Sequence, residues 1–101
     1  MAQKMYDASG ASTAEIIAST ADRTKIYGIM AVGLAVGSTI ELRVGTGGVW
    51  STGDTVLVWE ASAAEVGNAK VVFPEGSEFF AGGGSNLLAD ATGDWLILTH
   101  T

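Results

Sequence analysis

The sequence predicts an all-β protein, an antiparallel β-sandwich or barrel of about eight short strands with no long helix. Short apolar runs recur roughly every 8 to 12 residues between glycine-rich or polar turns, the spacing of small all-β domains. Residues 38–44 alternate cleanly, with Ile40, Leu42 and Val44 on one face and polar side chains on the other. This is the pattern of a half-exposed antiparallel strand.

The expected strands follow from alternation, from β-branched content and from the turns between them. In chain order they span residues 13–20, 25–32, 38–44, 54–60, 70–73, 77–80, 85–88 and 95–99. Residues 61–68 are expected to be a loop or a short helical turn. In the second strand, one face is expected to carry Ile26, Gly28, Met30 and Val32, and the other Lys25, Tyr27, Ile29 and Ala31.

Two turns organise the C-terminal part of the chain. Pro74 cannot donate to a strand ladder, so the turn over Pro74, Glu75 and Gly76 is expected at a sheet edge or at a crossing between sheets. The three glycines at 82–84 interrupt the chain. After them, 85–88 and 95–99 are expected to form a closing hairpin.

A chain of 101 residues is one domain by size. Residues 1–12 lack a sustained period and are expected to be an N-terminal arm, followed by a single β-sandwich domain over 13–101. The strands at 54–60 and 95–99 are apolar on both faces. Such strands are expected where another subunit covers the outer face of a sheet.

Composition favours protein partners. Hydrophobic residues make up 48% and charged residues only 16%, against about 25% in typical soluble domains. The net charge of -6 disfavours nucleic acid and anionic membranes, which require clustered cations. No signal peptide is evident, and the longest apolar run, 26–36, is too short to span a bilayer, so a soluble protein is expected.

No motif indicates catalysis, a metal or a cofactor, and the protein is not expected to be an enzyme. Residues 45–48 do not complete a phosphate-binding glycine motif. His100 is the single histidine and adjoins the C-terminus, where a triad is hard to hold. Asp90 and Asp94 lack the calcium-loop pattern and fit a turn. There is no cysteine, so disulfides and thiolate chemistry are excluded.

The candidate interface residues are aromatic or apolar side chains in loops and strands. Trp59 and Trp95 lie in two-sided strands and are expected in the core, whereas Trp50 lies in a glycine-rich loop and is either an interface anchor or a loop-packing residue. The full set of interface candidates is Trp50, Val49, Tyr6, Tyr27, Phe79 and Phe80.

The segments VVFPEGSEFFAGGGSNLLADATGDWLILTHT and TKIYGIMAVGLAVGSTIELR resemble small jelly-roll β-sandwich virion proteins of tailed bacteriophages. The resemblance covers roughly residues 24–101 and departs from that pattern in the triple glycine and in a longer 45–53 loop. It implies a jelly-roll-like sandwich acting as a capsid decoration (cement) protein, or as a head-tail or tail component. The implied partner is the major capsid protein or another virion protein.

The same resemblance implies self-association, with a trimer favoured, and a location on the capsid exterior after assembly in the host cytoplasm. An alternative is a carbohydrate- or receptor-binding module in which Trp50 and Tyr27 form stacking platforms. Gene neighbourhood would separate these readings, because a decoration protein is expected beside a major capsid gene.

Overall fold

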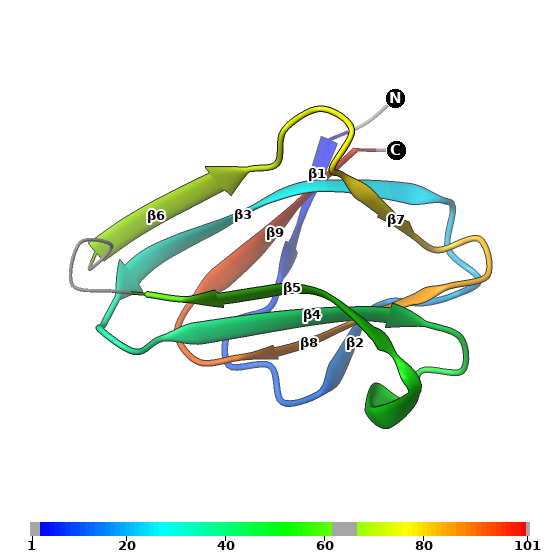
Figure 1. Cartoon of the computed structure of the whole chain (residues 1–101), viewed down its shortest axis with the longest axis horizontal. Helices are drawn as coiled ribbons and strands as arrows, with labels where there is room; N and C mark the ends of the chain where they lie inside the picture. Colours follow the sequence, from blue (N-terminus) through cyan, green and yellow to red (C-terminus); the bar gives the residue numbers. More distant parts are fainter. Residues whose placement is uncertain (1–2, 62–66, 101) are drawn as a thin grey trace.

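The chain folds into two antiparallel sheets packed face to face (Figure 1). The computed structural model describes residues 3–61 and 67–100, without the side chains of 32–34 and 67–69. The strands in this part of the chain are β1 (Gln3–Asp7), β2 (Ala14–Ile17), β3 (Thr24–Leu34), β4 (Thr39–Gly45), β5 (Asp54–Glu60), β6 (Gly67–Val72), β7 (Phe79–Ala81), β8 (Asn86–Ala91) and β9 (Trp95–His100). One 3-10 turn, η1 (Trp50–Thr52), lies in the loop between β4 and β5.

The strand order is that of a jelly roll. Sheet A has the order β1-β9-β3-β6, with β7 also paired to β3, and sheet B has the order β2-β8-β4-β5. Within the sheets β1 pairs with β9, β2 with β8, β3 with β6 and β4 with β5, all antiparallel. The chain is thus one long hairpin, rolled up where β9 joins β3 and β8 joins β4. The predicted jelly-roll-like β-sandwich is confirmed.

The expected closing hairpin is wrong. β8 lies in sheet B and β9 in sheet A, so the turn at 92–94 carries the chain from one sheet to the other. Trp95 anchors this crossing, because its buried ring donates a 2.8 Å hydrogen bond from Nε1 to the Thr92 carbonyl oxygen. Short spacing between two apolar runs indicated a hairpin, but it cannot distinguish a hairpin from a crossing between layers.

The assignment of β3 side chains to the two faces of the sheet is also wrong from Gly28 onward. The pairing with β9 shifts register between Ile26 and Gly28, so that Tyr27 is an extra residue in a β-bulge. The bulge reverses the phase of the alternation, and Ile26, Ile29 and Ala31 all enter the core. Gly28 and Met30 therefore lie on the outer face.

β1 lies inside the segment expected to be an arm. It forms one edge of sheet A, and the Thr99 hydroxyl donates a 2.6 Å hydrogen bond to the Lys4 carbonyl oxygen. Four of its five side chains are exposed and only Tyr6 is half-buried. An edge strand with so little buried surface shows no apolar alternation, which is why the sequence pattern missed it.

Pro74 lies at the edge of sheet A, as predicted. The segment that contains it connects β6 and β7, which both pair with β3. The Ser77 amide donates a 2.9 Å hydrogen bond to the Pro74 carbonyl oxygen, and Gly76 has a φ of +93°. A positive φ at the third position is the conformation that favours glycine in this kind of turn.

The triple glycine docks on the turn between β2 and β3. The Gly83 amide donates to the Ala21 carbonyl oxygen at 2.8 Å, and the Gly84 amide donates to the Ser19 carbonyl oxygen at 2.7 Å. A Cβ at Gly82 would overlap the Asp22 carbonyl oxygen. The run therefore provides close backbone contact as well as a bend.

The core fills the space between the sheets. Sheet A contributes inward side chains from β3 and β9, and sheet B contributes them from β4 and β8. The buried core residues of these four strands are Ile26, Ile29, Ala31, Ile40, Leu42, Leu87, Ala89, Ala91, Trp95 and Ile97. Trp59 is partly buried against this cluster, so the core placement predicted for Trp59 and Trp95 is confirmed.

Candidate protein-binding surfaces

The outer face of sheet A carries an apolar line across four strands, which we name the central row. Strand register places Met5 of β1, Leu98 of β9, Gly28 of β3 and Val72 of β6 side by side. Met5 is 57% exposed and Val72 is 55% exposed, whereas Leu98 between them is 4% exposed. Sheet register therefore fixes the order of these residues across the surface.

The neighbouring row, named the charged row, has opposite charges at its two ends. It runs from Asp7 through Leu96 and Met30 to Lys70. Leu96 and Met30 are half-buried, and Asp7 and Lys70 are exposed. Hydrogen bonds from the Ser9 side chain and backbone lower the pKa of Asp7, so that carboxylate stays ionised at neutral pH.

Tyr27 lies between two hollows on the same face. Each has a volume of about 440 Å³, and both are also lined by Gln3. The first, which we name the Tyr27 hollow, is mixed in character, with Phe73 and His100 among its lining residues. It also contains the ion pair between Lys25 and Glu78, and backbone hydrogen bonds from the amides of Glu78 itself and of Gly76 lower the pKa of Glu78.

The two phenylalanines of β7 lie in different environments. Phe79 packs against the core and stacks with Phe73 at a centroid distance of 6.0 Å. Phe80 is 44% exposed, and the Arg23 guanidinium lies 4.1 Å from its ring centroid. Of these two interface candidates, only Phe80 offers substantial free surface.

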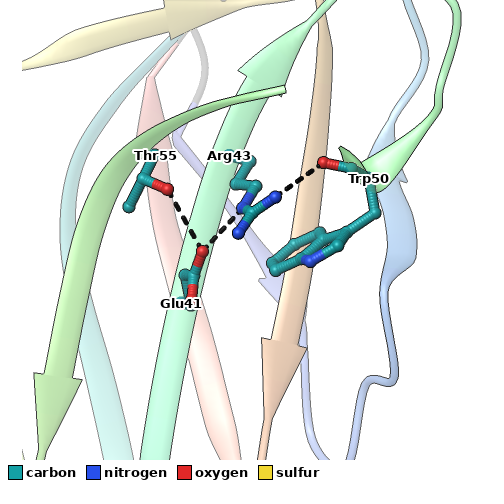
Figure 2. A network of polar contacts seen from close by, with 4 residues as sticks. All are labelled: Glu41, Arg43, Trp50 and Thr55. Atoms are coloured by element: carbon teal, nitrogen blue, oxygen red, sulfur yellow. Dashed lines mark hydrogen bonds and ion pairs between the residues drawn. The ribbon is translucent and has the colours of Figure 1, made fainter. Parts of the chain in front are cut away.

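The outer face of sheet B is organised by Arg43 of β4 (Figure 2). Its Nε donates to Glu41 Oε2 at 2.6 Å, and its Nη1 donates to the Trp50 carbonyl oxygen at 2.9 Å. Its guanidinium also lies 4.3 Å from the Trp50 ring centroid, and the Thr55 hydroxyl donates to the same Glu41 oxygen at 3.2 Å. The hydrogen bond from Arg43 lowers the pKa of Glu41 most strongly.

The loop over 45–53 is held against the outer face of sheet B. A Cβ on Gly48 would approach the carboxylate of Glu15 on β2, and Glu15 itself accepts a hydrogen bond from Asn86 of β8. Trp50 is half-buried, whereas the adjacent Val49 is 50% exposed. The loop thus tucks its tryptophan onto Arg43 and presents Val49 to solvent.

β5, at one edge of sheet B, exposes two further valines. Val58 is 65% exposed and lies opposite Glu41, and Val56 is 38% exposed at a register shift between β4 and β5. The inward residues of the same strand, Leu57 and Trp59, pack against the core. The two-sided apolar pattern of 54–60 thus corresponds to one buried and one exposed face.

The six predicted interface residues do not form one surface. Tyr27 and Phe80 belong to the sheet A side, and Trp50 and Val49 to the sheet B side. Tyr6 is half-buried against the core, with the Lys4 ammonium 4.7 Å from its ring centroid, and Phe79 is likewise turned to the core.

Sequence reasoning missed the exposed apolar residues that the register brings together, above all Met5 and Val72. Met5 was missed because β1 was assigned to an arm. Val72 lies in a run of apolar residues, where alternation is absent and cannot separate the buried from the exposed member.

Two searches concern only the part of the chain that the structure describes. Within residues 3–61 and 67–100, no group of three or more metal-ligating side chains converges. Over the same residues, no helix is long and apolar enough to cross a membrane. Comparison of the chain with protein-family models, with curated proteins and with solved structures gave no match.

Proposed function

We propose that this protein is a bacteriophage capsid decoration (cement) protein, which self-associates and stabilises the shell by bridging capsid subunits. The observation that supports it best is that exposed apolar side chains occur on both outer faces of the jelly roll, Met5 and Val72 on one side and Val49 and Val58 on the other. A protein that bridges needs at least two separate contact surfaces, and apolar patches are typical of such surfaces.

The two faces suit different partners. The 45–53 loop projects Val49 from a position fixed by Arg43, and the neighbouring strand adds Val58. We assign contact with the shell to this side. The outer face of sheet A, where Met5 and Val72 are exposed, then remains for contact between copies. Residues 3–7 take no part in shell contact as an arm, because they are paired in β1.

Co-sedimentation with shells tests this function. The probe is a particle assembled from the major capsid protein of the same genome. Wild-type protein is expected to pellet with the particles, and Val49→Asp and Val58→Asp to pellet much less. Ser12→Asp adds the same charge at an exposed position in the loop between β1 and β2 and is expected to bind as wild type. Wild-type protein that stays in the supernatant would refute the decoration role.

The carbohydrate-binding alternative retains one supporting observation, the Tyr27 hollow. Tyr27 and Phe73 offer aromatic surface there, and Lys25, Glu78 and His100 supply polar groups, a mixture that suits a sugar. Trp50 cannot share this site, because it lies on the outer face of the opposite sheet.

A glycan array tests the alternative. Binding that Tyr27→Ala abolishes and Trp50→Ala preserves would support a lectin-like role. If the wild-type protein binds no glycan on the array, the carbohydrate-binding alternative is refuted.

A further inference from the structure

We infer that the outer face of sheet A is a dimer interface, on which a second copy of this chain packs face to face about a twofold axis parallel to the strands. This inference rests on the self-association in the proposed function, and names the surface and the symmetry. It follows from the positions that strand register gives to the side chains of the central and charged rows.

The symmetry fixes which residues meet. A twofold axis along the strands, set between β9 and β3, places β1 over the partner's β6 and β9 over the partner's β3. An interface of this kind is isologous, so each contact occurs twice. In the central row, Met5 meets the partner's Val72, and Leu98 meets the partner's Gly28. Both contacts are apolar.

Gly28 lies at the centre of this interface, between Leu98 and Val72 in the register, and is buried. A Cβ there would overlap the Val71 carbonyl oxygen and crowd the Leu98 side chain of the same chain, so the close approach of β3 and β6 requires glycine at this position. Leu98 is 4% exposed and covers Gly28 within its own copy. The contact between the two copies in this row is therefore carried by Met5 and Val72, which are exposed.

The charged row is complementary to itself under the same axis. Asp7 at the β1 end meets the partner's Lys70 at the β6 end, and the pair is repeated by symmetry. Leu96 meets the partner's Met30 between the two pairs. Both charged side chains are exposed, and the Asp7 carboxylate also accepts a 2.8 Å hydrogen bond from the Ser9 amide.

The alternative axis makes no such match. An axis perpendicular to the strands, through the central row, would place β1 over the partner's β1 and set Asp7 opposite the partner's Gln3. Opposite charges across an interface fix orientation and suppress wrong arrangements. The charge pattern therefore selects the axis along the strands.

A third row, formed by Gln3, His100 and Lys25, lies at the rim of the interface and contributes little to its attraction. It places His100 opposite the partner's Lys25, which already pairs with Glu78 at 3.8 Å. Attraction therefore comes from the central and charged rows.

The size of the face sets the strength of the dimer. Four strands about 4.8 Å apart and about six residues at 3.4 Å each give on the order of 400 Å² per copy, or about 800 Å² for the pair. Stable interfaces bury about 1,200 Å² or more, and smaller ones are weak or transient. The dimer is therefore expected to depend on concentration, with a Kd on the order of micromolar or weaker.

Sedimentation equilibrium at neutral pH, up to about 500 µM protein, tests the inference. Wild-type protein is expected to shift from monomer to dimer over this range. Asp7→Lys and Lys70→Asp each place like charges in both symmetric pairs, and each is expected to weaken the dimer about tenfold. The double variant Asp7→Lys/Lys70→Asp restores opposite charges and is expected to return the Kd to within about threefold of wild type.

Val72→Asp and Val58→Asp add the same charge on opposite faces. Val72→Asp is expected to abolish the dimer, and Val58→Asp to leave it unchanged. Far-UV circular dichroism and thermal melting of each variant establish that it is folded, and folded variants alone are compared.

A wild-type protein that is monomeric throughout, or trimeric, would overturn the inference. So would a double variant no tighter than the single ones, or a Val58→Asp variant that dimerises as poorly as Val72→Asp. The outcome is separable from the proposed function. If the protein dimerises but does not bind shells, the decoration role is refuted and the dimer stands. If it binds shells but stays monomeric, the dimer is refuted and the decoration role stands.

Discussion

The guanidinium of Arg43 lies 4.3 Å from the centroid of the Trp50 ring, and its Nη1 donates a 2.9 Å hydrogen bond to the carbonyl oxygen of the same residue. Arg43 also holds Glu41 through its Nε (Figure 2). One side chain on β4 therefore fixes both the ring and the backbone of the 45–53 loop. Trp50 has a loop-packing role in the monomer, and the loop tip presents Val49.

Removing Arg43 is expected to release this loop. Arg43→Ala loses a hydrogen bond of about 1 kcal/mol and a cation-π contact of about 0.5 to 1 kcal/mol, so the free energy of unfolding should fall by about 1 to 2 kcal/mol. Trp50→Ala keeps the carbonyl acceptor but loses the cation-π contact together with the burial of its half-buried ring, so it is expected to destabilise the fold as well. Urea unfolding followed by circular dichroism measures both changes. A stability of Arg43→Ala equal to wild type would show that the loop does not depend on this side chain.

Acid is expected to destabilise the fold through the carboxylates that accept hydrogen bonds. The pKa of Glu41 in the folded state lies below its ordinary value of 4.5, chiefly because of Arg43. The stability that follows from this shift is present above the unfolded-state pKa and is lost as the pH falls through the folded-state pKa. Unfolding midpoints should therefore decline below about pH 4.5, and less steeply in Glu41→Gln. Identical pH profiles for the two proteins would contradict this role of Glu41.

Substitutions at two adjacent glycines can distinguish the cost of a positive φ from the cost of steric overlap. Gly82 and Gly83 both have positive φ, at +81° and +61°. A Cβ at Gly82 would overlap the Asp22 carbonyl oxygen, whereas a Cβ at Gly83 would make only an ordinary contact with Arg23. Gly82→Ala is expected to be less stable than Gly83→Ala by about 1 to 3 kcal/mol, the range for overpacking. Thermal melts of the two variants measure the difference. Equal melting temperatures would mean that the β2-β3 turn moves aside freely.

The fold class was predictable because alternation and turn residues are local signals. The 38–44 alternation appears as β4, with Ile40 and Leu42 fully buried. The pairing of the last two runs was not predictable, since their separation allows either a hairpin or a crossing between sheets. The face of each residue in β3 was not predictable either, because the bulge at Tyr27 depends on its partner β9.

The candidate surfaces were predictable only in part. A loop tryptophan is a visible signal, but its packing on Arg43 depends on how the 45–53 loop folds back over β4. The central row places Met5 and Val72, which are 67 positions apart in the sequence, in one line across the sheet, and that alignment exists only once β1, β9, β3 and β6 are in register. The match between Asp7 and Lys70 has the same origin.

Cryo-electron microscopy of decorated shells tests the central claim most directly, that the two outer faces of the jelly roll make separate contacts. Shells assembled from the major capsid protein of the same genome would be imaged with the wild-type protein bound. The predicted result is added density with the 45–53 loop and Val58 against the shell, and with the outer face of sheet A against a second copy. Bare shells, or bound copies with Met5 and Val72 against the shell, would contradict it.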